Sequence, residues 1–316
     1  MKKGENNMKK TIRIFLTCSL AFVVMFGLAG CGNNETNAEV KDENNTIRLG
    51  VMSASDSAPI LLAQEKGYFE QEGVNLELEI FTNAATKQSS IQAGELDASM
   101  LSMIQFLNNS KAGLEGKITT TTDGTFPIVL SKNFSEKKDV KVGLMEVSVT
   151  NFLADQYLKD YNVEKVFINE MPVRMQMLMA DELDMAVLPE PLASNAELKG
   201  LKKVVYGDPD DFTPNAIVFT NEFIEKNPKT VEGFHNAYNK AVKDINNNVE
   251  EAKDILVNKL ELDPQVKDLM VLPTYHTTRI PTLEYLNEVE EWTEKILDTT
   301  LDLNYDDIVS KKFVVK

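Results

Sequence analysis

The carboxylate with the most unusual setting in this sequence is Glu190, which lies between Pro189 and Pro191 directly after the short apolar run Met185–Leu188. A carboxylate at the end of a predicted strand can accept hydrogen bonds from an amine, an amidine or an aminopyrimidine. Asp56 is the other acidic residue that we expect in a comparable loop. Together, the two acids favour a neutral or amine-bearing heterocycle over a small anion as the ligand.

Residues able to act as nucleophiles or metal ligands are scarce. The sequence has two cysteines, Cys18 and Cys31, and two histidines, His235 and His276. Two histidines without a cysteine pattern are weak evidence for a metal site. The spacing of the Ser, His and Asp residues does not predict a catalytic triad. We therefore expect a binding protein with no enzymatic activity, no metal and no cofactor.

The other candidate ligand contacts come from loops that follow predicted strands or begin predicted helices. In open α/β sheets, ligands bind outside the carboxyl ends of the strands, near helix N-termini. With Glu190, these candidates are Ser55, Asp56, Ser57, Thr82, Asn83, Ser102, Met103, Thr125, Ser148, Val149, Thr150 and Asn215.

Several candidates have a structural alternative. Ser57 and Ser148 can act only as helix caps, and Thr82 and Asn83 can be simple turn residues. Met103 can belong to the core. These alternatives stay open at the level of sequence.

Cationic residues are absent from these loops. None of them contains arginine, and we expect the nearest lysine, Lys87, to face solvent. Tyr275 and His276, in the segment 273–279, could reach the rim of a cleft and stack on a ring, or could belong to a structured loop between helices.

The elements that must position these residues follow a pattern that occurs twice, in 46–103 and in 139–190. A β-patterned run ends in Gly, an apolar residue and Met at Gly50–Met52 and again at Gly143–Met145. An acidic tetrad precedes a short apolar run at Gly94–Asp97 and Asp181–Asp184. Strands alternating with helices predict two α/β lobes, each a mostly parallel sheet flanked by helices, with a ligand cleft between them.

Two β-patterned segments that contain proline, 125–131 and 213–220, are expected to cross between the lobes. The remainder reads as helical, beginning at Asn227-Pro228 with an amphipathic stripe to about Asn247. The expected strands are 46–52, 74–81 and 98–101, then 140–145, 166–168 and 185–188. Later helices are expected at 249–259, 264–269 and 281–299, wrapping the first lobe.

The N-terminal segment predicts export. Basic residues precede an apolar stretch that ends in Leu28-Ala29-Gly30-Cys31, whether translation starts at Met1 or Met8. These features are typical of a signal peptide, and the final four residues resemble the lipobox of bacterial lipoproteins. We expect cleavage after residue 30, lipid on Cys31 and a flexible tether over 31–46. The formal net charge of −16 argues against nucleic acid and anionic lipid as partners.

Four motifs in order resemble one family of proteins. They are Ala58–Gly67 followed by Tyr68-Phe69, the Ala93–Asp97 segment, Leu188–Pro191, and Phe223–Pro228. The set is similar to the signature of the nitrate, sulfonate, taurine and thiamine-pyrimidine class of solute-binding proteins, and it covers nearly all of the chain after the tether.

The resemblance implies a two-lobed type II periplasmic-binding-protein fold. It places one lobe at 47–126 plus 219–316 and the other at 127–218, joined by two crossing strands. It implies a monomer that closes on a small solute and delivers it to the permease and ATPase subunits of an ABC importer. The ATPase must be a separate subunit, because no Gly-x-x-x-x-Gly-Lys-Ser/Thr motif occurs here. A pyrimidine-synthase-like enzyme on the same fold and a sensor or adhesion lipoprotein are the alternatives.

Overall fold

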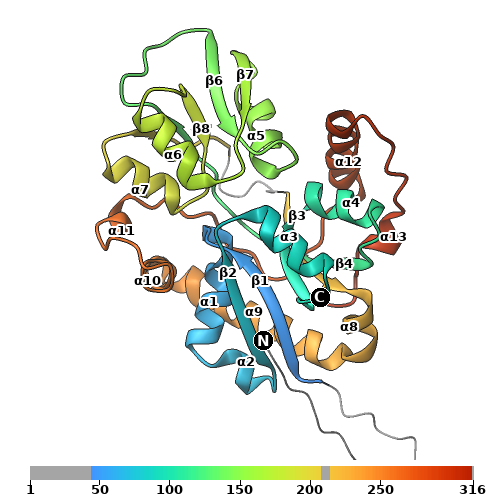
Figure 1. Ribbon diagram of the computed structural model, residues 1–316. Coiled ribbons are helices and arrows are strands. Elements are labelled where there is room, and N and C mark those ends of the chain that lie inside the picture. Colours follow the sequence, from blue (N-terminus) through green and yellow to red (C-terminus); the bar gives the residue numbers. More distant parts are fainter. Residues whose placement is uncertain (1–43, 208–213, 315–316) are drawn as a thin grey trace, which may run out of the picture. The chain divides into compact units, whose positions relative to one another are not determined.

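The computed structural model describes residues 44–207 and 214–314 (Figure 1). All of the helices and strands described below belong to one compact unit of the chain. The predicted signal peptide, Cys31 and most of the predicted tether lie outside the described residues.

The first sheet has five strands in the order β2-β1-β3-β10-β4. β1 is parallel to β2 and β3, whereas β10 is antiparallel to both β3 and β4. The bounds are β1 Thr46–Met52, β2 Asn75–Phe81, β3 Ala98–Ser102, β4 Gly116–Thr121 and β10 Asn215–Thr220. β10 leads back from the second sheet to the first. Residues 215–218 already pair with β3 of the first sheet, although the sequence analysis had assigned them to the second lobe.

The second sheet repeats this arrangement with the order β7-β6-β8-β5-β9. β6 is parallel to β7 and β8, and β5 is antiparallel to β8 and β9. The bounds are β5 Ile128–Leu130, β6 Asp139–Leu144, β7 Asn162–Phe167, β8 Met185–Val187 and β9 Lys202–Val204. The repeat in the sequence is therefore a repeat in topology, and the predicted α/β fold class is confirmed. Each crossing segment ends in an antiparallel strand of the sheet that it enters.

The acidic tetrads have the same structural role in both sheets. Asp97 accepts a hydrogen bond from the backbone N–H of Arg48, and Asp184 accepts one from the N–H of Lys141, each at 2.9 Å. Each aspartate thereby fastens the short buried third strand to the first strand of its sheet. This accounts for the tetrad without a role in ligand binding.

Helices flank both sheets. The first sheet carries η1 Ser55–Ser57, α1 Ala58–Glu65, α2 Tyr68–Gln71, α3 Ala84–Gln92, α4 Met103–Lys111, α8 Asn221–Lys226, α9 Pro228–Asn247, α10 Val249–Lys259, α12 Leu283–Leu297 and α13 Tyr305–Ile308. The second sheet carries α5 Val149–Tyr157, α6 Met171–Met179 and α7 Leu192–Leu198, and α11 Val266–Leu269 packs against α7. We call the two groups lobe 1 and lobe 2; the exact boundaries of the lobes stay a prediction.

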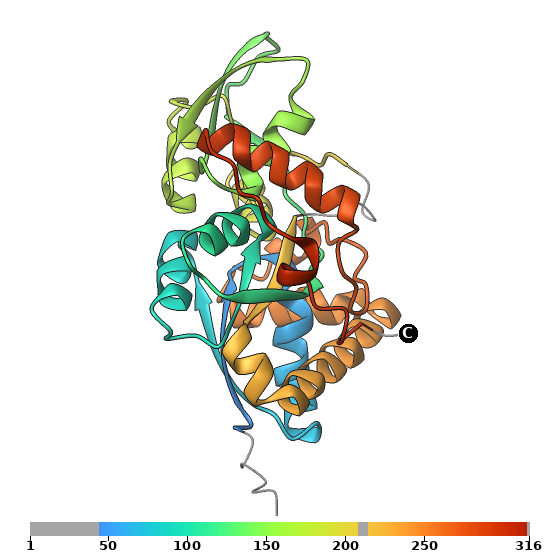
Figure 2. The same cartoon turned by 90° about the vertical axis from the view of Figure 1, so that its right-hand side faces the viewer.

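The sequence suggested that the C-terminal helices wrap lobe 1. Not all of them do. α9 and α10 pack on α1 of lobe 1, whereas α11 contacts lobe 2. α12 packs on α4 of lobe 1 and also reaches α5 of lobe 2, where the Trp292 ring lies edge-on to Phe152 at 5.4 Å (Figure 2). The C-terminal segment therefore contacts both lobes.

Within the described part of the chain, none of the helices is long and apolar enough to cross a membrane. The same residues contain no cluster of three or more His, Cys, Asp or Glu side chains that could hold a metal ion.

Candidate ligand-binding site

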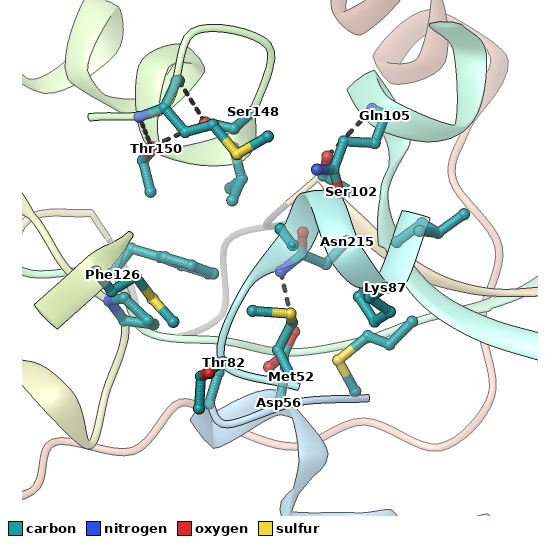
Figure 3. A pocket seen from close by; sticks show the side chains of 18 of the residues that line it. Met52, Asp56, Thr82, Lys87, Ser102, Gln105, Phe126, Ser148, Thr150 and Asn215 are labelled. Carbon is teal, nitrogen blue, oxygen red and sulfur yellow. Dashed lines mark hydrogen bonds between the residues drawn. The ribbon is translucent and has the colours of Figure 1, made fainter. Parts of the chain in front are cut away.

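A cavity is lined by residues of both lobes (Figure 3). Seven of the predicted contacts line it: Asp56, Thr82, Ser102, Ser148, Val149, Thr150 and Asn215. As predicted, they come from the ends of strands and the beginnings of helices in both halves of the repeat.

The wall of the cavity is mostly apolar, and sequence reasoning did not assign most of it. Met52 and Met145, the last residues of the two Gly-apolar-Met runs, both line the cavity. The remaining lining residues that we did not predict are Ala54, Ala84, Lys87, Met100, Leu101, Gln105, Phe126, Asn169, Met171, Arg174 and Pro189. The methionine that ends both Gly-apolar-Met runs is the sequence feature that could have predicted the apolar wall.

Asp56 lies at the junction of 3₁₀ helix η1 with the returning strand β10. Its Oδ2 accepts hydrogen bonds from Asn215 Nδ2 at 2.9 Å and from Thr122 Oγ1 at 3.4 Å, while its Oδ1, also buried, has no hydrogen-bond partner. Burial raises the pKa of the Asp56 carboxyl to about 6, and the positive charge of Lys87 opposes this rise. The carboxylate is thus held by lobe 1 and keeps one unused acceptor.

Ser102 caps helix α4, as its sequence position allows. Its Oγ accepts the backbone N–H of Gln105 at 3.2 Å. The side-chain Nε2 of Gln105, which also belongs to the cavity wall, is buried and has no hydrogen-bond partner. An unused buried donor of this kind is costly unless something in the cavity accepts its hydrogen bond.

Lobe 2 presents the N-terminus of α5 to the cavity. Ser148 Oγ donates to the carbonyl oxygen of Met145 at 2.7 Å and lies 2.8 Å from Thr150 Oγ1, which accepts the Met145 N–H at 3.2 Å. These bonds fix the turn between β6 and α5. Ser148, Val149 and Thr150 lie at the positive end of the helix dipole, which favours negative charge.

The prediction that Lys87 faces solvent is wrong. Its side chain is 1% exposed, it lines the cavity, and among the described residues no group forms a hydrogen bond or close ion pair with its ammonium. Burial lowers the pKa of Lys87 to about 7, while the charge of Asp56 acts in the opposite direction. A bound anion would restore the protonated form.

Arg174 is the second cation in the cavity wall and was not predicted. It is 2% exposed, and its guanidinium donates to the carbonyl oxygens of Ile168 at 2.8 Å, Val187 at 3.2 Å and Asn169 at 3.3 Å. Burial lowers its pKa to about 10, which leaves it charged at neutral pH. A guanidinium has five N–H donors, so three such bonds leave two for a ligand.

Glu190 is not part of the cavity wall. It is fully buried, and its carboxylate is 2.7 Å from the ammonium of Lys203 and accepts the backbone N–H groups of Ser194 at 3.1 Å and Val271 at 3.3 Å. Its acceptors are therefore used within the protein, where they join α7 and β9 to the segment after α11. The expected contact between Glu190 and an amine ligand loses its structural basis.

Five other predicted contacts also lie outside the cavity wall. Ser57 donates to the Ala54 carbonyl at 2.7 Å, and Ser55 Oγ accepts the Thr125 N–H at 3.2 Å, so these three residues brace the turn behind Asp56. Asn83 caps α3, and Met103 is fully buried in the core. Asn83 and Met103 therefore have structural roles, as a residue of the turn before α3 and as a core residue, in line with the alternatives noted from the sequence.

Tyr275 and His276 do not line the cavity. The Tyr275 hydroxyl donates to the Ser55 carbonyl at 2.8 Å and the side chain is 1% exposed. The backbone N–H of His276 donates to Asp123 at 2.8 Å. Both residues hold the segment 273–279 against lobe 1 behind the site, so neither is placed to stack on a ligand.

Two sheets of equivalent strand order, with a cavity lined by residues of both, have the type II periplasmic-binding-protein fold. The chain belongs to the NMT1/THI5-like family, whose model matches residues 54–252. Several of the similar proteins are named as binding proteins.

Comparison with individual proteins gives the same class. A protein of Bacillus subtilis (strain 168) assigned to the binding of aliphatic sulfonates is 26% identical over 318 residues, with 93% of this chain and 94% of the relative covered. The ligand-binding component of an ABC-type import system from Staphylococcus aureus, solved with zinc bound, has a TM-score of 0.73 at 17% identity, covering 85% of this chain and 98% of that one. The alkanesulfonate-binding protein SsuA of Xanthomonas axonopodis pv. citri bound to MOPS has a TM-score of 0.67 at 14% identity, covering 81% and 92%.

Proposed function

We propose that this protein binds a small organic monoanion of the aliphatic sulfonate type and delivers it to an ABC importer. The observation that carries the proposal is the Lys87 ammonium, which lies buried in the cavity wall with no hydrogen-bonding partner among the residues of the described chain. An unpaired buried cation is costly, and a ligand anion removes the cost.

The charge of the cavity wall supports a single negative charge on the ligand. Its ionisable residues are Asp56, Lys87 and Arg174. With all three ionised, two positive charges face one negative charge, and a monoanion makes the sum zero. The α5 N-terminus and the two unused N–H groups of Arg174 supply donors for the oxygens of such a group.

The apolar part of the wall supports an organic ligand rather than a bare inorganic ion. Met52, Met100, Met145 and Met171 surround the cavity together with Phe126. Methionine side chains adapt to irregular apolar shapes, so they suit a short alkyl chain of variable form. The name of the Bacillus subtilis relative and the MOPS bound to the Xanthomonas protein agree with a sulfonate head on such a chain.

The protein works, in this proposal, on the outer face of the cell membrane. The N-terminal 30 residues direct export, the lipid on Cys31 anchors the chain, and residues 31–46 form the tether. The mature protein acts as a monomer whose lobes close on the solute, and a permease and an ATPase, encoded separately, complete the importer.

Thermal and urea denaturation test the ligand class. Ethanesulfonate at a hundredfold excess over its dissociation constant should stabilise the protein by about 2.7 kcal/mol, whereas an aminopyrimidine should not. Lys87→Met should weaken ethanesulfonate binding about 10- to 100-fold, because a hydrogen bond to a charged group contributes about 1.5–3 kcal/mol. The exposed lysine Lys243, changed to Met, serves as the matched control. Stabilisation by the aminopyrimidine and not by any sulfonate would overturn the proposal.

A further inference from the structure

Helix α12, drawn in red in Figure 2, contacts two helices that begin at the cavity, one in each lobe. α4 of lobe 1 begins there with Ser102 and Gln105, and α5 of lobe 2 begins there with Ser148, Val149 and Thr150. Both helices therefore carry polar groups of the candidate site. A helix that contacts both can fix the distance between these groups.

The contact of α12 with lobe 1 is mainly apolar. Leu286, Val289 and Thr293, spaced three and four residues apart, form the buried face of α12. Leu286 and Val289 belong to the same hydrophobic cluster as the buried residues of α4. Beyond the C-terminus of α12, the carbonyl oxygen of Thr300 accepts a hydrogen bond at 2.5 Å from Lys111, the last residue of α4. The helix is thereby fixed to lobe 1.

The contact of α12 with lobe 2 depends on the side chain of Trp292. Its indole ring lies edge-on to Phe152 of α5, with 5.4 Å between the ring centroids, and its Nε1 donates to Asp155 Oδ2 at 3.0 Å. One turn earlier on α12, Glu288 Oε1 accepts a hydrogen bond from Gln156 Nε2 at 3.3 Å. The residues on each helix are three or four positions apart, so one face of α12 meets one face of α5.

The partners of Trp292 are themselves fixed within lobe 2. Phe152 is 2% exposed, and its backbone N–H donates to the carbonyl oxygen of Ser148 at 3.2 Å, in the turn of α5 that lines the cavity. Asp155 Oδ1 forms an ion pair with Lys165 of β7 at 2.6 Å, while Oδ2 accepts from the indole. A displacement of Trp292 is therefore transmitted to the first turn of α5.

We propose that α12 is a cross-brace that sets the separation of the α4 and α5 N-termini, and that Trp292 is the positioning residue through which it acts on the ligand site. The effect on binding rests on the proposed function, because it requires the ligand to lie between these two helices. Helices already held at the separation that the ligand needs require less ordering when it binds, and this preorganisation raises the affinity. The brace itself acts without the ligand, so the ligand-free protein also tests it.

Spin labels measure the brace in the ligand-free chain. Glu95→Cys and Glu182→Cys, both at exposed positions, place one label in each lobe. The full-length chain, purified in detergent, carries Cys18→Ser and Cys31→Ser so that only the two introduced thiols are labelled. The measured quantity is the distribution of distances between the two labels.

The brace predicts a narrow distance distribution while Trp292 is present. Trp292→Ala should broaden the distribution in the ligand-free chain. Leu283→Ala is the matched control, since it also shortens a large apolar side chain of α12 but at a position that is 55% exposed. It should leave the distribution as it is in the wild type.

Calorimetric and stopped-flow titration with ethanesulfonate measure the effect on the site. Trp292→Ala should weaken binding about tenfold, mainly through faster dissociation, because an edge-on aromatic pair and a hydrogen bond are lost together. Trp292→Phe keeps a ring against Phe152 but lacks the indole N–H. It should give an affinity and a distance distribution between those of the wild type and Trp292→Ala.

Circular dichroism and thermal unfolding confirm that each variant is folded. A Trp292→Ala chain with the wild-type distance distribution, or with the wild-type affinity, would assign Trp292 a packing role alone and overturn the brace, whatever its unfolding temperature, while the sulfonate function stands. A wild type that binds no sulfonate overturns the proposed function instead, and the ligand-free distances then decide whether α12 braces the lobes.

Discussion

Raising the pH from 7 to 9 is expected to make the ligand-free protein more stable and, at the same time, to weaken anion binding, both through Lys87. Burial lowers the folded-state pKa of Lys87 to about 7, from 10.5 in the unfolded chain. Between these values the unfolded chain keeps a proton that the folded protein has lost, so the free energy of unfolding rises with pH. Integrated from pH 7 to 9, the gain is about 2 kcal/mol.

Anion binding has the opposite sign. If only the protonated ammonium binds the anion, the competent fraction falls from about one half at pH 7 to about one hundredth at pH 9, and the apparent affinity falls about fiftyfold. Arg174 does not contribute in this range, because its pKa stays near 10. Asp56, whose pKa burial raises to about 6 from 3.8, acts in a separate window: stability falls as the pH rises from about 4 to 6.

Urea denaturation and calorimetric titration with ethanesulfonate at pH 7, 8 and 9 measure both effects. Lys87→Met should remove the rise in stability and the fall in affinity together, and the difference between the two proteins isolates Lys87 from other titrating groups. Lys87→Arg should keep anion binding nearly constant over this range, because arginine stays charged. If wild type and Lys87→Met show equal pH slopes in stability and in affinity, the reasoning is refuted.

Three further changes test other parts of the structure. Glu190→Gln should lower the free energy of unfolding by about 1.5–3 kcal/mol in urea, because it weakens the charge-assisted hydrogen bond from Lys203, whose ammonium keeps Glu197 as its other carboxylate partner. Calorimetry should show sulfonate affinity unchanged within about twofold, and a selective loss of affinity would contradict the placement of Glu190 outside the cavity. Gly143→Ala should lower the free energy of unfolding by about 1–3 kcal/mol in urea, because the added Cβ would overlap Leu183; an unaltered stability would argue against that overlap. Cys31→Ser should abolish incorporation of a labelled fatty acid and release the protein from membranes, and a membrane-bound variant would exclude the lipid anchor.

The scaffold was predictable because its signals are local. The runs that end in Met52 and Met145 follow the first strand of each sheet, and the tetrads precede the third strands. Apolar runs and glycine positions determine these elements within a few residues of chain. The strand β4, Gly116–Thr121, was missed because its threonines read as a polar loop; they are buried by pairing with β10, nearly a hundred residues later.

The chemistry of the site was less predictable because it depends on distant partners. Glu190 was assigned to the ligand, but its carboxylate contacts Lys203 and Val271, and sequence alone does not reveal such contacts. Lys87 was assigned to solvent, but α3, which is polar almost throughout, buries Lys87 and Ile91. A residue-by-residue alignment of the two repeats, extended into the second helices, would have paired Lys87 with Arg174.

The repeat also explains how one scaffold can bind an asymmetric solute. The Lys87 and Arg174 positions, and those of Met52 and Met145, contribute equivalent groups from each side, so cationic and apolar contacts are shared between the lobes. The symmetry is broken where Ser102 of lobe 1 corresponds to Pro189 of lobe 2 and where Asp56 places a carboxylate in lobe 1 alone. The unused acceptor of Asp56 and the unused donor of Gln105 both belong to lobe 1, so in the proposed function we expect selection among different tails to lie mainly in that lobe. In the same proposal, Arg174 and the α5 N-terminus of lobe 2 would supply the contacts common to all such anions.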